Sequence, residues 1–304
     1  MTAPTHAPER SIDRARLALQ LSPATCSWSI EIVDTTGSTN TDLTERLRAS
    51  RDSVDALAEP LVRVAYLQSA GRGRRGRQWL AAAGDALMFS LAYPIQRPVA
   101  ELAGLSLAVG TAILAGLRSL APLESAQLAL KWPNDILLDG AKLGGALIET
   151  AWSTPTASAL VIGIGLNLHG APALAGQLEA LSAPGVPVNA IAALDQSLPQ
   201  PDMTATLAAL LNALAEMLTR FEQDGFAPFR DAWSADHAYA GQAVVLIENG
   251  LEVARGTADS VDEQGLLQIT AADGTLHSYA VGDVSLRLRA GTQAMPQAGA
   301  GVQR

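Results

Sequence analysis

The sequence is poor in the residues that form disulfides and metal cages. Its single cysteine, Cys26, cannot form an internal disulfide, and a lone thiol is ordinary in a reducing compartment, so we expect a cytoplasmic protein. The four histidines have no paired spacing with one another or with Cys26, so we expect no transition-metal cage and only oxygen ligands for any metal. These histidines are His6, His169, His237 and His277.

Long apolar runs and net positive charge are also missing. Charged residues make up 17% of the chain and apolar residues 48%, which is enough to build a sizeable core. Glycine and charge interrupt the apolar runs, and the start lacks the apolar core of a signal peptide, so neither secretion nor membrane insertion is expected. The net charge of -9 argues against a general nucleic-acid-binding surface, because such a surface is cationic.

The predicted fold is α+β, with a large domain followed by a small β domain. The length of 304 residues is more than one typical domain needs. Both ends are rich in alanine, proline, glycine and glutamine and lack the apolar periodicity needed to pack. After Trp233, short alternating segments separated by glycine-containing turns are typical of a small β-barrel. We expect a frayed segment (1–25), a large domain (26–235), the barrel (236–290) and a disordered tail (291–304).

Apolar periodicity predicts the elements of the large domain. Apolar residues over 207–221 recur at helical spacing, and Gly225 marks the helix end. The nearly continuous apolar stretch 99–120 predicts a second long helix. Short strands with tight turns are expected from residue 128 to 149, whereas 171–201 should be mainly loop with one or two helical turns. Single strands are expected at 61–67, 86–93 and 160–168.

A glycine-rich segment after the first of these strands concentrates positive charge. Four arginines fall within six positions of an acidic protein. The segment has neither the Gly-Lys-Ser/Thr of a phosphate-binding loop nor the dinucleotide fingerprint. Two interpretations remain: a solvated basic turn, or a mobile loop whose N–H and guanidinium groups close over a small polyanion. The residues are Gly71, Arg72, Gly73, Arg74, Arg75, Gly76 and Arg77.

Lysine is nearly absent, and its placement is informative. The chain has two lysines, Lys131 and Lys142, against nineteen arginines, and both lie within twelve residues. A compact, flexible charge at these positions indicates a binding role, but two lysines on a polar rim also occur as structural groups. Asp135 lies between them in a Pro-Asn-Asp turn, where it can pair with the lysines or hold Mg²⁺ beside a phosphate. Spacing leaves both interpretations open.

A polar triplet, Ser38-Thr39-Asn40, precedes a helical pattern that contains Leu43 and Leu47. Its simplest role is to cap the start of that helix. Hydroxyl and amide groups there can also hydrogen-bond a uracil-like or ureido ligand. Different atoms of the triplet can serve both purposes.

Taken together, five motifs in order resemble the biotin–protein ligases. The resemblance implies a mixed central sheet with helices, of the class II synthetase-like biotin ligase kind, and an SH3-like C-terminal β-barrel. Two further segments extend it over most of the chain. The motifs are GSTN at 37–40, QSAGRGRRGRQW at 68–79, KWPNDILL at 131–138, KLGGALIE at 142–149 and IGIGLNL at 162–168, followed by FEQDGFAPF at 221–229 and GDVSLR at 282–287.

The resemblance also implies the chemistry. Biotin would react with ATP to give biotinyl-5′-AMP and pyrophosphate, and the biotin would then pass to one lysine of a biotin carboxyl carrier protein. Lys142 and Arg72 are expected to be catalytic, and Asp135 is expected to hold Mg²⁺. The implied biotin contacts are Ser38, Thr39, Asn40, Gln68, Gly71, Arg72, Gly73, Arg74, Lys142 and Gly145, and the implied nucleotide contacts are Arg75, Arg77, Trp79, Lys131, Asn134 and Asn167.

Some family members carry an amino-terminal winged-helix domain that binds DNA. Thirty-seven residues precede Ser38 and none predicts a helix-turn-helix, so no DNA partner is expected. A lipoate ligase or octanoyl transferase would share the fold but lack the Gly-Arg segment and the KWPND turn. A biotin-sensing regulator without transfer activity would need a DNA-binding segment. The sequence leaves the identity of the carrier open, and the choice between monomer and homodimer as well.

Overall fold

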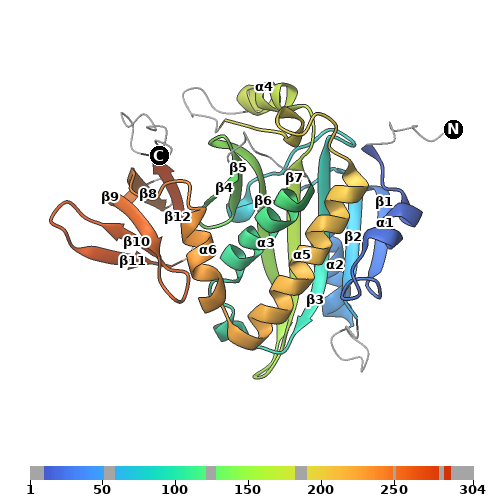
Figure 1. Cartoon of the computed structure of the whole chain (residues 1–304), viewed down its shortest axis with the longest axis horizontal. Helices are drawn as coiled ribbons and strands as arrows, with labels where there is room; N and C mark the ends of the chain where they lie inside the picture. The colour runs from blue at the N-terminus through green and yellow to red at the C-terminus, as the bar shows by residue number, and fades with distance from the viewer. Residues whose placement is uncertain are drawn as a thin grey trace, which may run out of the picture.

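A seven-stranded mixed sheet forms the centre of the molecule, as predicted (Figure 1). The structure, a computed structural model, describes residues 10–50, 59–120, 128–181, 190–248, 251–280 and 284–288. The strand order is β1-β2-β3-β7-β6-β5-β4, in which only β1 and β2 pair in parallel. The strands are β1 (Ser29–Thr36), β2 (Leu61–Gln68), β3 (Ala86–Ile95), β4 (Leu128–Lys131), β5 (Asp135–Leu138), β6 (Ala141–Ser153) and β7 (Ser158–Asn167).

Helices cover the two faces of this sheet unequally. Figure 1 shows α3 and α5 crossing one face and α2 lying on the other. The helix predicted over 207–221 is part of α5, which Asp202 caps and Gly225 ends. Among the helices of the described ranges, none has the length and apolar character needed to cross a bilayer. The helices are α1 (Arg14–Gln20), α2 (Thr39–Ala49), α3 (Leu105–Leu120), α4 (Ala171–Leu181), α5 (Met203–Asp224) and α6 (Arg230–Ala235), with short 3₁₀ turns η2 (Arg74–Gly76), η3 (Val99–Glu101), η4 (Leu194–Gln196) and η5 (Ala227–Phe229).

Strand β7 shows how the two faces differ. Successive side chains of a strand point to opposite faces. Leu160 and Ile162 belong to the main core together with α3 and α5. Ala159 and Val161 belong to a smaller core with leucines of α2. The next positions on the α2 side are glycines, so the sheet surface is bare of side chains there.

The start of the chain is better ordered than predicted. The frayed segment expected over residues 1–25 is wrong from Arg14 onward, where α1 forms. Asp13 caps this helix by accepting hydrogen bonds from the N–H groups of Ala15 and Arg16, and Leu17 is buried in the main core. One buried leucine and a good cap are enough to dock a two-turn helix on an existing core. Residues 1–9 and the expected tail 291–304 lie outside the described residues.

Two helical predictions need correction. The long helix expected over 99–120 is interrupted at Gly104, whose φ of 78° lies in the left-handed region, and a Cβ at that position would lie 2.3 Å from the ring of Phe226. Helix α4 is longer than the one or two turns expected there, because alanine and leucine dominate its sequence and favour a helix.

The C-terminal part forms a second, antiparallel sheet in the order β11-β10-β9-β8-β12. The predicted small antiparallel β domain is therefore confirmed, although the sheet does not close into a barrel within the described residues. Strand β11 has four residues, three of them exposed, and therefore offers little apolar surface for closure against β12. The strands are β8 (Ala243–Glu248), β9 (Leu251–Val261), β10 (Leu267–Thr270), β11 (Leu276–Tyr279) and β12 (Val284–Leu288).

A buried histidine lies where the two sheets meet. His237 follows α6, and Leu130 of β4 exchanges hydrogen bonds with the backbone on either side of it. Its ring stacks on Trp233 with a centroid separation of 4.7 Å, and its Nδ1 lies 3.1 Å from the carbonyl oxygen of Asp259. Its Nε2 has no hydrogen-bond partner among the described residues. Burial lowers the pKa of His237 to about 4, so the folded protein holds this ring neutral.

This histidine predicts a loss of stability in mild acid. In the unfolded chain His237 takes up a proton near its ordinary pKa of 6.5, whereas in the folded protein it does so only near pH 4. The free energy of unfolding is therefore at its full value above about pH 6.5 and decreases as the pH falls toward 4. Between pH 7 and pH 5 we expect this group to lower the free energy of unfolding by about 2 kcal/mol. In urea unfolding, the His237→Gln variant should lack this decrease in the free energy of unfolding between pH 7 and pH 5. His277→Gln, at an exposed site, should retain it, and equal pH dependence of wild type and His237→Gln would contradict the assignment.

Candidate functional site

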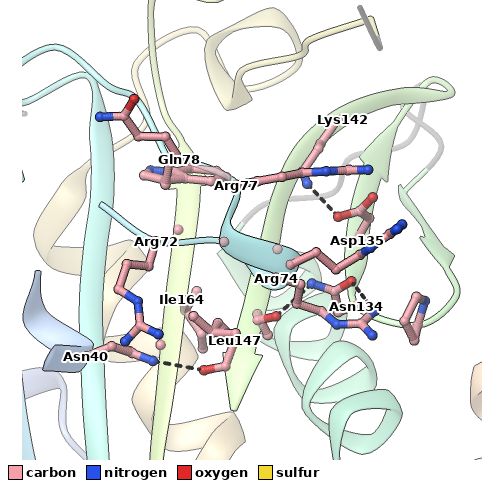
Figure 2. A pocket seen from close by; sticks show the side chains of 18 of the residues that line it. Asn40, Arg72, Arg74, Arg77, Gln78, Asn134, Asp135, Lys142, Leu147 and Ile164 are labelled. Carbon is pink, nitrogen blue, oxygen red and sulfur yellow. Dashed lines mark hydrogen bonds and ion pairs between the residues drawn. The ribbon is translucent and has the colours of Figure 1, made fainter. Parts of the chain in front are cut away.

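One cavity gathers most of the polar residues singled out in the sequence. It has a volume of about 150 Å³, room for a small organic ligand rather than for water alone. Figure 2 shows Arg72 and Asn40 at one end of it and Lys142, Asp135 and Asn134 at the other. The predicted residues that line it are Ser38, Thr39, Asn40, Gln68, Arg72, Gly73, Arg74, Arg75, Arg77, Trp79, Lys131, Asn134, Asp135, Lys142 and Gly145.

The two lysines meet on one carboxylate. Lys142 Nζ lies 2.5 Å from Asp135 Oδ1, and Lys131 Nζ lies 3.3 Å from Asp135 Oδ2. Burial alone would raise the pKa of Asp135, but the two ammonium groups outweigh burial and hold that pKa below its ordinary value. Burial lowers the pKa of Lys131, and Asp135 opposes this shift. The cluster keeps one net positive charge, which is suited to binding an anion.

The β4–β5 turn places this cluster. Strands β4 and β5 pair directly, with Lys131 opposite Asp135, and β6 returns beside them so that Lys142 reaches the same carboxylate. The Asp139-Gly140 turn between β5 and β6 has φ values of 49° and 78°, the positive angles of a tight hairpin. A side chain at Gly145 would lie 3.4 Å from Asp135 Oδ1, so glycine keeps the space above the cluster open.

The arginine loop, residues 71–77, is folded back on itself. Trp79 N–H donates to Gly71 O and Gly73 N–H donates to Arg77 O, while Arg75 has a positive φ of 61°. Arg72 forms an ion pair with Glu149 of β6, with an Nη2–Oε1 distance of 3.0 Å. Arg74 Nη1 lies 3.4 Å from Asn134 Oδ1. These contacts favour a loop held over the cavity and contradict a purely solvated basic turn.

The opposite end of the cavity is a hydrogen-bonded set of neutral groups. The predicted cap is formed by Ser38, which accepts from Thr41 N–H at 3.5 Å, and not by Thr39 with Asp42 as the spacing of a capping box suggested. Thr39 N–H donates to Gln68 Oε1 at 2.8 Å, and its hydroxyl lies 2.7 Å from that of Ser90. Ser90 hydroxyl in turn donates to Asn40 Oδ1 at 2.6 Å. This end presents mainly hydroxyls and amides, and its charged groups, Arg72 and Glu149 beside Asn40, are paired with each other.

Two glycines of β7 make room for these side chains. A Cβ at Gly163 would lie 2.0 Å from Asn40 Oδ1, and one at Gly165 would lie 2.6 Å from the indole of Trp79. Glycine in a strand often marks such close approach. Glycines in a buried strand predict close approach by a ligand or a neighbouring backbone, but the neighbours here are side chains of this chain.

Two of the predicted contacts do not line the main cavity. Gly71 packs against the Trp79 backbone, where a Cβ would lie 2.5 Å from the carbonyl oxygen. Asn167 lies at a second cavity of about 30 Å³, beside Asp85 and His169. Among the described residues, Asn167 Oδ1 and Trp79 Nε1 are buried without a hydrogen-bond partner, so both have a polar group to offer a ligand.

Sequence reasoning missed several residues of the site. Glu149 lies inside the KLGGALIE motif, and its charge in a buried strand was the available signal. Ser90 is the one polar residue of the run ALMFSLAY and has no exposed surface. Leu286 reaches the cavity from β12, which strand spacing could not reveal. The other lining residues that were not singled out are Gln78, Phe89, Trp132, Pro133, Ala146, Leu147 and Ile164.

The chain is similar to known proteins over both of its sheets. The sequence profile of the Biotin/lipoate A/B protein ligase family matches residues 34–167, and that of the Biotin protein ligase C terminal domain matches residues 239–287. The chain is 36% identical to the biotin--[acetyl-CoA-carboxylase] ligase of Paracoccus denitrificans, over 66% of this chain and 80% of that one. It is 31% identical to the ligase of the same name from Mycobacterium tuberculosis, over 90% and 95%.

A solved structure extends the likeness to three dimensions. The biotin protein ligase from Aquifex aeolicus in complex with biotin and ATP superimposes with a TM-score of 0.65 at 25% sequence identity. The match covers 86% of this chain and 99% of that chain. With two family profiles and relatives above 30% identity over most of the sequence, the chain belongs to the biotin protein ligase family.

Proposed function

We propose that this protein is a biotin–[biotin carboxyl-carrier protein] ligase. Biotin and ATP would form biotinyl-5′-AMP and pyrophosphate, and the biotin would then pass to one lysine of a carrier protein. The observation that carries the proposal is the cavity with two different ends. Hydroxyls and amides around Thr39 and Gln68 suit the neutral ureido ring, whereas the cations around Lys142 suit a carboxylate and phosphates.

The charge at the cationic end fits the first step. A biotin carboxylate oxygen attacks the α-phosphorus, the bond from that phosphorus to the bridging oxygen breaks, and pyrophosphate leaves. The attacking group is already ionised, so this step needs alignment and charge stabilisation more than a general base. Six cations line the cavity against one carboxylate, Asp135, among its described residues. Lys142 is the cation that we assign to the carboxylate and α-phosphate.

The second step is acyl transfer. The neutral carrier amine attacks the biotinyl carbonyl, the bond to the AMP oxygen breaks, and the nitrogen loses a proton to solvent. AMP leaves as an anion, so the same cations stabilise it. We assign Trp79 Nε1 to the nucleotide, because it lies at this cavity and is buried without a partner among the described residues. Asn167 Oδ1 is buried in the same way but lies at the second cavity, so we rank it behind Trp79 as a nucleotide contact.

Asp135 does not fit a resident Mg²⁺ site as it stands. Both of its oxygens are engaged by lysine ammonium groups. The described part of the chain has no group of three His, Cys, Asp or Glu side chains that could hold a metal. In our proposal Mg²⁺ therefore enters with the triphosphate as MgATP, held by phosphate oxygens. Asp135 then orients the two lysines.

The assay of the proposed function uses the protein with biotin, MgATP and a biotin carboxyl carrier domain, read by mass spectrometry. We expect one biotin per carrier, only when ATP is present, and none on a carrier whose target lysine is arginine. Accumulated adenylate without carrier labelling would contradict the transfer step. Labelling with lipoate or octanoate in place of biotin would identify the lipoate-ligase alternative of the same family.

Removal of the Lys142 charge should slow adenylate formation. We expect Lys142→Ala to reduce the rate of biotinyl-AMP synthesis by at least about 100-fold, because a preorganised cation is lost from the transition state. Lys142→Arg should restore only part of the rate, because the guanidinium group is larger and differently shaped. Lys131 still pairs with Asp135, so the fold should survive. A wild-type rate for either variant would contradict the role, and Arg46→Ala at a surface ion pair is the control.

Arg72 should retain the reactive intermediate. Loss of its contact with Glu149 should loosen the loop, so Arg72→Gly is expected to make biotinyl-AMP at raised substrate levels and to release it early. The expected result is labelling of an unrelated lysine-rich protein mixed into the reaction, with stronger competition by hydroxylamine. Gel filtration of the loaded protein measures retention directly. If the variant retains biotinyl-AMP as well as the wild type and labels the carrier as selectively, Arg72 does not hold the intermediate in the site.

A further inference from the structure

Glu149 enters the function proposed above as the partner of Arg72 alone, yet it also contacts Asn40 at the start of α2. Its two carboxylate oxygens receive the two Nη groups of Arg72, at 3.0 and 3.2 Å. The same carboxylate accepts a hydrogen bond from Asn40 Nδ2 at 2.9 Å. Glu149 thus joins the arginine loop to the start of α2, two segments that are far apart in the sequence.

Asn40 connects Glu149 to Ser90, and its amide group is already hydrogen-bonded within the protein. Its Nδ2 donates to Glu149 and to the carbonyl oxygen of Leu147, and its Oδ1 accepts from Ser90 hydroxyl. The residue is 4% exposed, and the missing side chain of Gly163 provides its space. Asn40 was predicted as a biotin contact, but its geometry fits a connector.

A carboxylate at position 149 fixes the direction of these bonds. It can only accept, so the Asn40 amide must turn its NH₂ toward Glu149 and its oxygen toward Ser90, and the carbonyl oxygen of Leu147 supports the same orientation from 3.3 Å. The Ser90 hydroxyl then donates its single hydrogen to Asn40 Oδ1, at 2.6 Å. The 2.7 Å contact between Ser90 and Thr39 therefore requires Thr39 hydroxyl to be the donor. This contact is shorter than the 3.3 Å from Thr39 hydroxyl to Gln68 Oε1.

The result is a hydroxyl of defined polarity on the cavity wall. Thr39 lines the cavity, and with its hydrogen committed to Ser90 its oxygen faces a ligand as an acceptor. An N–H donor such as that of a ureido ring meets this requirement. We propose that Glu149 is a positioning residue that orients the Glu149–Asn40–Ser90–Thr39 chain to accept a ureido N–H and anchors Arg72 to that chain. This inference rests on the proposed function, because biotin is the ligand that it positions.

Glu149→Gln is the direct test, because it keeps the shape of the side chain but removes the charge and can turn an NH₂ donor toward Asn40. The longer 3.3 Å contact with the Leu147 carbonyl oxygen is then the one bond that still orients the Asn40 NH₂ group. We expect biotin to bind about tenfold more weakly, by calorimetry without ATP, which corresponds to about 1.4 kcal/mol. The KM for ATP and the melting temperature should stay near wild type. Glu31→Gln is the matched control, because Glu31 also pairs with two arginines, Arg46 and Arg63, away from the cavity.

A double-mutant cycle with Arg72→Ala distinguishes the two contacts of Glu149, the ion pair with Arg72 and the hydrogen bond with Asn40. Adenylate retention should be non-additive, since either change breaks the same ion pair. Biotin affinity should still fall when Glu149→Gln is added to Arg72→Ala, since the hydrogen bond with Asn40 is independent of Arg72.

Unaltered biotin affinity in a folded Glu149→Gln protein would overturn this inference alone. Equal increases in the KM of biotin and ATP with a lower melting temperature would also overturn it, by showing a structural role. Failure of the wild type to bind biotin would overturn the proposed function and this inference with it.

Discussion

The site depends on two positions in β7 where the sheet carries no side chain. At Gly163 and Gly165 the backbone is bare on the α2 side, and Asn40 and Trp79 occupy the space that side chains would fill. Earlier in β7 and on the same face, Ala159 and Val161 pack against α2. The change from small apolar residues to glycine therefore converts a packed face into the floor of a cavity. A side chain at Gly163 would displace Asn40, and one at Gly165 would displace Trp79.

Charge is the second constraint. The protein is acidic overall, with a net charge of -9, yet its cavity is lined by six cations. Such a cluster repels itself unless something holds it, and the structure holds it in two ways. Asp135 joins the two lysines, while Glu149 and Asn134 contact arginines of the loop. These partners keep the cations in place over the sheet, which is the preorganisation that anionic substrates require.

Much of this arrangement was predictable because local signals agreed with the global fold. The periodicity of α5, the Pro-Asn-Asp turn and the glycine-rich loop each depend on neighbours in sequence, and the structure confirms each element. The gathering of Lys131, Lys142 and Asp135 followed from their closeness in the chain. Gly104 was not predicted as a break, since the ring of Phe226, which excludes a side chain at Gly104, is distant in the sequence.

Long-range contacts account for the rest of what the sequence did not reveal. Glu149, Ser90 and Leu286 join the site from strands far apart in the chain, and no spacing rule connects them. The second sheet was predicted as a barrel from its alternation and turns, but closure depends on whether its edge strands have apolar faces. Strand β11 does not. Helix α1 was missed for the opposite reason, because its few apolar residues dock on a core that the rest of the chain provides.

The central claim is that one cavity binds biotin and ATP together and joins them. Exchange of labelled pyrophosphate into ATP measures this reversal of the first step without any carrier protein. We expect pyrophosphate exchange into ATP only when biotin is present. Absence of exchange, or exchange at the same rate without biotin, would contradict it.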